Sequence, residues 1–416
     1  MALGVLGDFD VVVVGGGPGG FSAAVSSARN GAETLLVERY GFLGGMATAG
    51  LVNPFMKFHV GDEQIIGGVL QEVIDRLSAL GGYDFKSRAF DPEVMKYVLD
   101  EMALEAGVKL LYHTTFISAV VSEGYIRAIL IYNKSGLSMV TGRVFVDATG
   151  DGDLAVSAGA PFEKGRSQDG LTQPMTLNFD LANVDVQNMP TRRELNEAYR
   201  RARDEGRLKC PREDLLWFTT THDGMIHFNT TRIIRVDGTK AEDLTRAEIE
   251  GRRQMFEIVK WLKETFPAFR EAYVVRSGPQ VGVRESRRII GEYIMRGEDI
   301  LEARKFPDPI CRGSYPIDIH NPSGEGTIIK HPPPNDYYEI PYRCLIPLNV
   351  ENLLIASRCI SATHEAHSAI RIIPIVMGIG QAAGTAAALC VKHDTTPRRL
   401  DYQLLKEALR RGGAII

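Results

Sequence analysis

Apolar runs near the start of the chain alternate with a small-residue segment in a pattern that predicts a strand, a helix and a second strand. Val11–Val14 is an uninterrupted β-branched run, which is typical of a strand buried on both faces. Phe21–Arg29 is rich in Ala and Ser and predicts a helix that ends at Asn30-Gly31. The apolar run Thr34–Val37 predicts the second strand, so the chain opens with a β-α-β unit.

The pattern up to residue 147 predicts more helices and strands of the same domain. An amphipathic stretch within 67–79 indicates a short helix. Asp91 and Pro92 predict the N-cap and first residue of another helix, which ends near Gly107. Turn residues at 123–124 and 134–136 join three β-rich pieces into a meander. The remaining strands are expected at 108–112, parallel to the first two, and at 116–122, 125–132, 137–141 and 143–147.

The pattern changes after residue 160. Strand-like pieces within 161–330 alternate with long polar helices, one of which is expected to open at a capping box, Thr245 and Glu248, and to run to about Thr265. Residues 315–334 are rich in Pro, Gly, His and Asn, and predict a loop that returns to the first domain. We therefore expect an inserted α+β substrate or cap domain at 161–334.

The last stretch returns to the apolar pattern of the first domain. Residues 352–356 predict a strand, 357–365 a polar turn, and 375–388 a helix of very small residues that opens near Gly380. Small residues permit close approach of a ligand or of another backbone, and a packed core helix is the alternative explanation. The expected first domain is thus discontinuous and consists of 1–160 and 335–416.

Composition and charge exclude several classes of protein. The chain has 416 residues, 44% hydrophobic and 24% charged, with a formal net charge of −4, which gives no general attraction to nucleic acid or anionic membranes. The five cysteines are scattered without a C-x-x-C pair, so we expect no disulfide frame, iron–sulfur cluster or zinc site. Met1–Asp8 is too short and uncharged for a secretory signal, and no apolar run is expected to span a membrane. A reduced, cytoplasmic location is the expectation.

The glycines between the first strand and helix indicate a dinucleotide site. Gly15, Gly17 and Gly20 fit G-x-G-x-x-G, which lets backbone N–H groups approach a pyrophosphate at a helix N-terminus. Glu38 ends the second strand, where an acid would accept hydrogen bonds from ribose hydroxyls. An ordinary glycine turn and a surface acid are the alternatives, but strand, helix and acid at these offsets favour a dinucleotide.

A second glycine loop, 39–48, follows the acid and can lay further N–H groups along a diphosphate. It resembles the Gly-Gly loop of FAD proteins with a glutathione-reductase-like fold; a flexible surface loop is the alternative. Further segments that resemble the FAD-dependent oxidoreductase family are VDATGDGDLA (146–155), GVRESRRIIGEY (282–293), NLLIASRCISATHEA (352–366) and GIGQAAGTAAA (378–388). These segments occur in order from one end of the chain to the other.

The resemblance implies an α/β fold: a Rossmann-like FAD-binding domain with a β-meander, glutathione-reductase-like, plus the inserted domain. It also implies FAD, covalent or non-covalent, and a redox reaction. No metal is expected, because Asp151 and Asp153 are better explained as caps than as metal ligands. The predicted FAD-binding residues are Gly15, Gly17, Pro18, Gly19, Gly20, Glu38, Arg39, Gly44, Gly45, Met46, Ala47, Thr48, Phe116, Thr149, Gly150, Asp151, Arg358, Gly380, Gln381 and Ala382.

Histidines are the natural bases beside a flavin, which carries the electron chemistry itself. We expect His364 or His367 to exchange a proton with substrate, with His320 next and His59 as a weaker candidate; the alternative is that they are structural. Arginines form the other candidate group, because they could bind an acidic substrate or flavin oxygens, or could pair with neighbouring acids. These arginines are Arg287, predicted to be catalytic, with Arg284, Arg288 and Arg371. Arg232 is expected on a sheet of the inserted domain, where it could face the flavin or pair across strands.

The sequence thus predicts a dehydrogenase or oxidase that oxidises or reduces a small polar or sugar-like substrate by hydride transfer to flavin. The alternative is a flavoprotein subunit of a larger electron-transfer or RNA-modifying system, although the chain has neither cluster cysteines nor a basic tail. The expected partners are a small-molecule substrate and an electron acceptor of unknown kind, with no nucleic acid and no membrane. A homo-oligomer is compatible with the sequence.

Overall fold

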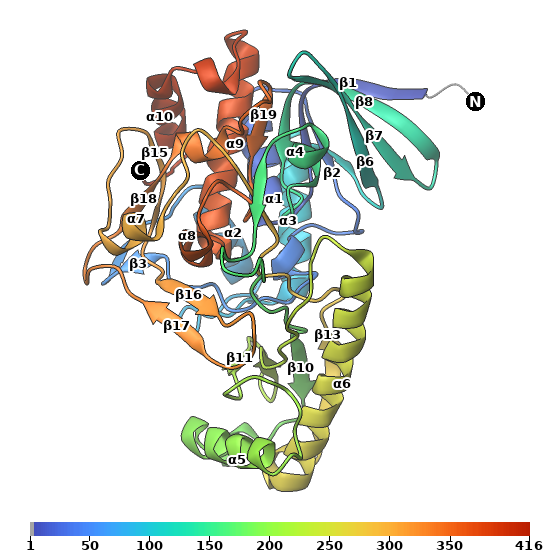
Figure 1. Cartoon of the computed structure of the whole chain (residues 1–416), viewed down its shortest axis with the longest axis vertical. Coiled ribbons are helices and arrows are strands. Elements are labelled where there is room, and N and C mark those ends of the chain that lie inside the picture. The colour runs from blue at the N-terminus through green and yellow to red at the C-terminus, as the bar shows by residue number, and fades with distance from the viewer. Residues whose placement is uncertain (1–3) are drawn as a thin grey trace.

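A seven-stranded sheet organises the part of the molecule that carries both ends of the chain (Figure 1). The computed structural model describes residues 4–416, so the first three residues of the predicted first domain, and of the segment Met1–Asp8, lie outside it. The strands of this sheet are β1 (Gly4–Val14), β2 (Thr34–Val37), β5 (Lys109–Leu111), β6 (Thr115–Ser122), β7 (Tyr125–Asn133), β8 (Gly136–Asp147) and β19 (Leu353–Ile355). Their order is β5-β2-β1-β8-β7-β6, and β19 also pairs with β8.

The half of the sheet around β1 is parallel, as the sequence predicts. β1 pairs in parallel with β2 on one side and with β8 on the other, and β5 adds in parallel to the outer edge of β2. Helices then cover the paired strands, so Val11–Val14 is buried on every side and needs no polar alternation. The predicted β-α-β unit and the strand at 108–112 are confirmed.

The meander differs from the prediction at one point. The expected strands at 137–141 and 143–147 form the single strand β8, because its hydrogen bonds to β1 continue past Gly142. The first half of β8 pairs with β7 and its last residues pair with β19, so one strand joins the meander to the parallel half. The carboxyl ends of β1 and β8 consequently meet at the same edge of the sheet.

Helices pack closely against this sheet. They are α1 (Pro18–Arg29), α2 (Val69–Ala79), α3 (Pro92–Glu105), α4 (Asp153–Ser157), α7 (Gly297–Leu301), α8 (His364–Ile370), α9 (Ile373–Lys392) and α10 (Tyr402–Arg411). Asp91 caps α3 as predicted, since its carboxylate accepts the N–H of Glu93 at 2.8 Å. In α9, a Cβ at Gly380 or Gly384 would overlap the α1 backbone at Gly19 or Ala23. Small residues therefore let α1 and α9 lie in backbone contact.

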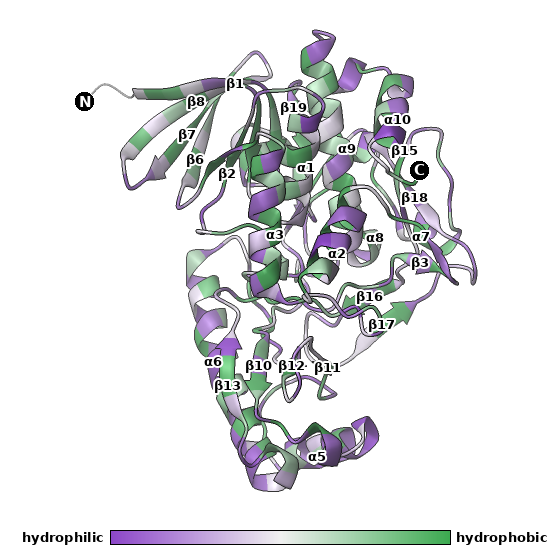
Figure 2. Cartoon of the chain, turned by 180° about the vertical axis from the view of Figure 1, so that it is seen from behind, coloured by the Kyte–Doolittle hydropathy of each residue, from purple (hydrophilic) through white to green (hydrophobic). Residues whose placement is uncertain are grey.

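A second unit hangs below the first and has its own hydrophobic core, formed by residues 175–283 (Figure 1). Its sheet has the order β11-β12-β10-β13, formed by β10 (Phe179–Ala182), β11 (Trp217–Thr219), β12 (Ile226–Phe228) and β13 (Tyr273–Ser277). Two helices accompany it, α5 (Arg192–Asp204) and α6 (Ala241–Thr265). In Figure 2, α5 is largely hydrophilic, as its charged sequence predicts. The helix predicted to open at Thr245 begins earlier, and Thr245 instead bonds the Ala241 carbonyl one turn back.

The remaining elements are short strands and one-turn helices. The strands are β3 (His59–Val60), β4 (Glu63–Gln64), β9 (Phe162–Lys164), β14 (Arg287–Ile289), β15 (Pro309–Gly313), β16 (Ile317–His320), β17 (Thr327–Lys330) and β18 (Tyr338–Pro341). The one-turn helices are η1 (Gly45–Ala47), η2 (Val186–Asn188), η3 (Pro267–Phe269), η4 (Tyr342–Leu345) and η5 (Pro397–Arg399). The region 315–334, predicted to be a loop, therefore contains the hairpin β16–β17.

Residues from Ile289 to Ile346 share the hydrophobic core of the first unit, although they belong to the predicted insertion 161–334. The division into 1–160, 161–334 and 335–416 stays a prediction as a statement about domains. The distribution of core residues shows only that the separate core of the second unit ends near residue 283.

One helix corrects the expectation that no apolar run reaches membrane-spanning length. By length and composition α9 could cross a membrane, but 94% of its most apolar window is buried inside the protein, as expected of a core helix. The cysteines behave as predicted for small buried hydrophobes: all five are buried and free.

Candidate functional site

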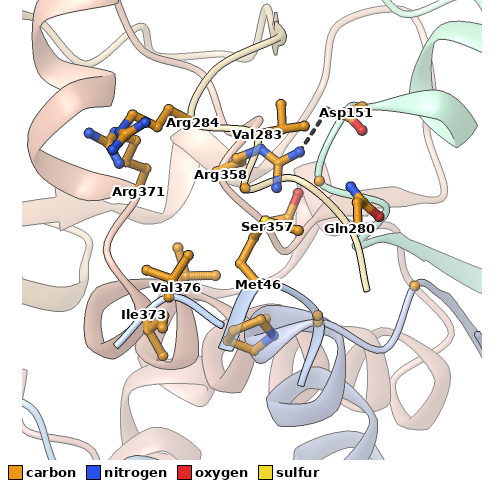
Figure 3. A pocket seen from close by; sticks show the side chains of 18 of the residues that line it. Met46, Asp151, Gln280, Val283, Arg284, Ser357, Arg358, Arg371, Ile373 and Val376 are labelled. Atoms are coloured by element: carbon orange, nitrogen blue, oxygen red, sulfur yellow. Dashed lines mark hydrogen bonds and ion pairs between the residues drawn. The ribbon is translucent and has the colours of Figure 1, made fainter. Parts of the chain in front are cut away.

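A cavity of about 1030 Å³ opens at the edge where β1 and β8 end, and it continues into the region between the two units. Figure 3 shows part of it, with Met46 and Ile373 toward one wall and Arg284 and Arg371 together at one side. The glycine loop lines one end. Side chains from the second unit and from β16, including Arg212 and His320, line the other end.

The glycine loop presents backbone donors to the cavity. α1 begins after Gly17, which caps it without any side-chain hydrogen bond, so the first N–H groups of this helix have no partner within the helix. Gly17, Pro18 and Gly19 line the cavity. A Cβ at Gly17 would meet nothing closer than the Gly45 Cα at 3.9 Å, so it would project into open space. These features fit a pyrophosphate held at a helix N-terminus.

The other glycines of the loop serve packing. A Cβ at Gly20 would overlap the Gly15 carbonyl oxygen, and one at Gly19 would overlap the Ala356 carbonyl oxygen. Gly15 adopts φ 101°, which an L side chain rarely adopts, and it lines the cavity. Gly20, predicted to bind the cofactor, lies behind the loop and lets α1 approach β1.

Glu38 lies where the sequence places it. Its carboxylate lines the cavity and accepts the backbone N–H of Gly16 at 2.5 Å and of Tyr40 at 2.9 Å. Burial raises the pKa of Glu38, and the two backbone donors oppose that rise. Two fixed donors orient the carboxylate so that its remaining lone pairs can accept ribose hydroxyls. Arg39 also lines the cavity and is held by the Gln280 side chain.

The second glycine loop contributes three of its six predicted residues to the cavity wall, Arg39, Gly45 and Met46. Gly44, Ala47 and Thr48 do not line the cavity. Thr48 Oγ1 donates to the Leu43 carbonyl at 2.6 Å and so closes the turn. These three residues, predicted to contact the cofactor, instead support the loop.

The wall between the two ends comes from the meander, from the turn after β8 and from the turn after β19. Phe116, Thr149, Gly150, Asp151 and Arg358 all line the cavity, and their contact with the cofactor stays a prediction. Arg358 Nη2 lies 2.6 Å from Asp151 Oδ1, which also accepts the Ser286 hydroxyl (Figure 3). The charges in this part of the wall are thus paired.

The helix of small residues meets the cavity with its first turn, which corrects the prediction for Gly380, Gln381 and Ala382. α9 begins at Ile373, so these three residues lie in its interior. The Gln381 side chain accepts the Val69 N–H and donates to the Gly412 carbonyl, away from the cavity. Ile372, Ile373 and Val376 line the cavity instead, and Ile372 caps the helix without a side-chain hydrogen bond. The positive end of the α9 dipole therefore faces the cavity, seven residues before Gly380, where the sequence predicts the helix to open.

Neither of the two preferred histidines lines the cavity. Thr363 caps α8, a helix in place of part of the predicted polar turn, and α8 carries both side chains into the protein interior. His364 Nδ1 lies 2.8 Å from Glu285 Oε1, which also pairs with Arg288. His367 is buried with no partner on either ring nitrogen, and burial holds the pKa of its imidazole well below its usual range. Both predictions are corrected, because α8 turns these residues into the core.

Arg287 does line the cavity, but it is not free to act on a substrate. Its Nη1 lies 2.7 Å from Asp153 Oδ1 and donates to the Asp151 carbonyl at 3.0 Å. These contacts hold its guanidinium at the cavity wall.

His320 is the predicted histidine that lines the cavity, and it sits on β16. Its Nδ1 accepts a hydrogen bond from Arg232 Nη2 at 3.2 Å, and its Nε2 lies 3.7 Å from Asp318 Oδ2. Burial, reinforced by the neighbouring arginines, lowers the pKa of His320 to about 3. The imidazole is therefore neutral at physiological pH, with its proton on Nε2.

Three residues of this end were missed by the sequence analysis: Arg212, Tyr315 and Asp318. Tyr315 Oη donates to Asp318 Oδ2 at 2.8 Å, and all three residues line the cavity. Asp318 and His320 alternate on one face of a strand, a period-two signal that the loop assignment concealed. Arg212 lies in an irregular charged segment, where no spacing marks it.

Metal ligation has no support in the part of the chain from residue 4 onward, where no group of three His, Cys, Asp or Glu side chains could hold an ion. The uncapped α1 N-terminus, the room at Gly17 and the fixed carboxylate of Glu38 together fit a dinucleotide. The second glycine loop and the α9 N-terminus line the same cavity as the charged end formed by Arg212, Asp318 and His320.

Comparison with known proteins agrees with this geometry. The family described as FAD dependent oxidoreductase matches residues 10–409. Thiamine thiazole synthase of Methanococcus maripaludis is 30% identical over 158 residues, which are 36% of this chain and 58% of that protein. Digeranylgeranylglycerophospholipid reductase of Methanocaldococcus jannaschii is 36% identical over 121 residues, 26% of this chain and 30% of that protein. The matches thus span little more than half of these relatives, or less.

Among solved structures, p-nitrophenol 4-monooxygenase of Pseudomonas putida superposes with a TM-score of 0.48 at 9% identity, over 97% of this chain and 84% of that one.

Proposed function

Because the chain belongs to the family of FAD-dependent oxidoreductases, we propose that it oxidises a small polar or sugar-like substrate by hydride transfer to FAD. The observation that carries this proposal is a single cavity. The glycine loop, the α9 N-terminus and the polar group of Tyr315, Asp318 and His320 all line it. A ligand at the charged end would therefore lie in the same space as the cofactor.

FAD, when bound, supplies a two-electron acceptor for the hydride. The free N–H groups at the start of α1 and the Glu38 carboxylate would hold it by its pyrophosphate and ribose. Arg358 is fixed by Asp151 beside the same loop and adds positive charge there. The first turn of α9 would offer its unpaired N–H groups to the other end of the cofactor.

His320 and Asp318 handle the proton in this proposal. His320 Nε2 lies 3.7 Å from Asp318 Oδ2, too far for a direct hydrogen bond, so a substrate hydroxyl beside both groups could accept from Nε2–H and donate to the carboxylate. Tyr315 orients Asp318 from the other side. This arrangement replaces the proposed role of His364 and His367.

The polar character of the far end supports a polar substrate. One relative is named for a phospholipid with two geranylgeranyl chains. The wall of this cavity also contains charged side chains, among them Arg212, Arg284 and Asp318, which would pair with the polar groups of a small substrate. The small-molecule partner, the cytoplasmic location and a possible homo-oligomer remain predictions.

Anaerobic bleaching of the oxidised flavin spectrum tests the proposal. A panel of polyols, sugars and hydroxy acids is mixed with the FAD-loaded protein, and oxygen is admitted afterwards to distinguish an oxidase from a dehydrogenase. At least one class should bleach the flavin, and His320→Gln should slow bleaching by about a hundredfold or more. His393→Gln, an exposed control, should bleach at the parent rate.

Bleaching by none of these compounds would overturn the proposal and favour the alternative of an electron-transfer subunit. Bleaching that His320→Gln leaves unchanged would remove His320 from the reaction.

A further inference from the structure

The charged end of the cavity is built from four segments that are distant in sequence. Arg212 precedes β11, Arg284 lies between β13 and β14, Arg371 joins α8 to α9, and β16 supplies Asp318 and His320. Figure 3 shows the guanidinium groups of Arg284 and Arg371 extending to the same side of the cavity. Three arginine side chains therefore line the same part of the cavity. The proposed hydride transfer to FAD assigns no role to any of them.

Arg212 is the most unusual of the three. Its side chain is buried, with 6% of its surface exposed, and its Nε has no hydrogen-bond partner. Burial lowers the pKa of Arg212, with Arg232 nearby as the next cause. An ionised group buried without a partner is strongly unfavourable, so such a group persists where a ligand of opposite charge completes it.

Arg371 and Arg284 repeat this pattern. Arg371 Nε also lacks a partner, and the nearest acceptor of its Nη2 is the neutral Gln173 Oε1 at 3.4 Å. Arg284 donates only to neutral acceptors, the Pro174 carbonyl at 2.8 Å, the Thr176 hydroxyl and Asn229 Oδ1 at 3.2 Å. Among residues 4–416, none of the three guanidiniums forms an ion pair within 4.0 Å.

The acids around this space leave an excess of positive charge. Arg232 is paired with Glu213 at 2.8 Å, and Asp214, which also lines the cavity, is bonded by Arg200 at 2.6 Å. Asp318 remains as the one acid in the cavity wall that faces Arg212, Arg284 and Arg371 together. Three cations against one carboxylate, with His320 neutral, leave two positive charges uncompensated.

The cofactor's diphosphate does not explain this excess. Its expected place is the N-terminus of α1 at Gly17, where Arg358 and Arg39 supply positive charge. Arg212, Arg284 and Arg371 line the part of the cavity that also holds Asp318 and His320, and the N-terminus of α9, which follows Arg371, adds its positive dipole end there. A second anion is needed.

We propose that the substrate of this enzyme is a small organic dianion with two carboxylate groups, bound by Arg212, Arg284 and Arg371. Guanidinium forks match carboxylates in geometry, and two carboxylates neutralise the two uncompensated charges. The proposal rests on the proposed function for the redox step only; the anion site itself does not depend on it.

Binding without turnover tests the anion site. The FAD-loaded, oxidised protein is titrated with succinate, propionate, inorganic phosphate and sorbitol, and the perturbation of the flavin spectrum is recorded at two ionic strengths. Succinate should bind at least about tenfold more tightly than propionate, more weakly as salt rises, and sorbitol should not compete with it. Tighter binding of phosphate than of succinate would overturn the assignment to carboxylates.

Substitutions locate the site. Arg212→Gln and Arg371→Gln should each raise the succinate Kd by about ten- to a hundredfold while FAD binding is kept, since one charge-assisted interaction is lost. Arg193→Gln, on the exposed surface of α5, should leave the Kd unchanged. If one buried variant fails to fold, the other still decides: an unchanged Kd in a folded variant overturns the proposal.

The two proposals fail separately. If dicarboxylates bind but no compound bleaches the flavin, the anion site stands and the oxidoreductase chemistry proposed above falls. If neutral polyols bleach the flavin while succinate does not bind, the chemistry stands and the dianion assignment falls.

Discussion

The two ends of the cavity use charge in opposite ways. At the glycine-loop end, Arg358 is held by Asp151 at 2.6 Å and Glu38 is held by two backbone N–H groups. At the far end, neither Arg212 nor Arg371 forms an ion pair within 4.0 Å with any of residues 4–416, whereas Arg358 does. The charges of the first end are therefore balanced by the protein itself. The second carries unbalanced charge, which indicates that its binding energy is reserved for a ligand.

Groups kept for binding a ligand lower the stability of the protein when the ligand is absent. Paired or backbone-held groups stabilise the fold whether or not the ligand is present, whereas unpaired buried cations weaken the protein until an anion arrives. Three measurements test this difference between the two ends of the cavity.

The largest effect is expected at the glycine-loop end. Gly17→Leu should lower the affinity for FAD by at least about a hundredfold, because its side chain projects into the cavity where the nearest protein atom to the Cβ is 3.9 Å away. The fold should survive for the same reason. FAD content and far-UV circular dichroism measure the two consequences.

The matched control is Gly4→Leu, since a Cβ at Gly4 meets nothing within 4 Å and this residue lies outside the cavity. Full FAD content in a folded Gly17→Leu protein would remove the glycine loop from the cofactor site.

The second prediction is that removing an arginine changes the free energy of unfolding in opposite directions at the two ends of the cavity. Arg358→Met should lower the free energy of unfolding by about 2–4 kcal/mol, because it leaves the Asp151 carboxylate unpaired in a wall where it is 12% exposed. Arg212→Met should instead raise it by about 1–2 kcal/mol, because it removes a buried charge that has no partner. Urea unfolding with FAD in excess and no added anion measures both.

Arg193→Met serves as the exposed control and should change the free energy of unfolding by no more than about 0.5 kcal/mol. A loss of stability in Arg212→Met as large as that in Arg358→Met would show that the far end is balanced in the protein itself.

The smallest effect concerns His320. Its pKa is about 3 in the folded protein and near 6.5 when unfolded, so the unfolded chain binds more protons between these values and stability falls as the pH falls from 6.5. In His320→Gln that part of the acid sensitivity should vanish, on the order of 1–2 kcal/mol between pH 6.5 and about 4.5. The charged groups around the ring are Arg212, Arg232, Arg284 and Asp318.

Urea unfolding of the parent and the variant across this pH range gives the comparison. Equal slopes against pH would mean that His320 is not held neutral by its surroundings. Succinate should diminish the difference, because an anion beside the arginines favours the protonated imidazole.

The glycine-loop end of the cavity could be predicted from the sequence, because its residues lie close together in the chain. The turn between β1 and α1, the strand β2 and Glu38 lie within residues 4–38, so turn geometry, helix capping and strand burial are decided by near neighbours. The family resemblance likewise rests on segments of about ten residues, each of which carries its own signal, and it gave the FAD-binding fold.

Tertiary structure decided everything that depends on which segments meet. His364 and His367 look as suitable in sequence as His320, but α8 turns them into the core while β16 faces the cavity. Gly380 fits a cofactor-binding glycine equally well, yet the close contact of α9 with α1 uses it for packing. Arg212 gives no signal at all, because an arginine is buried or solvated, paired or free, only through residues far away in the chain. Charge balance is a property of the assembled cavity, and no local pattern encodes it.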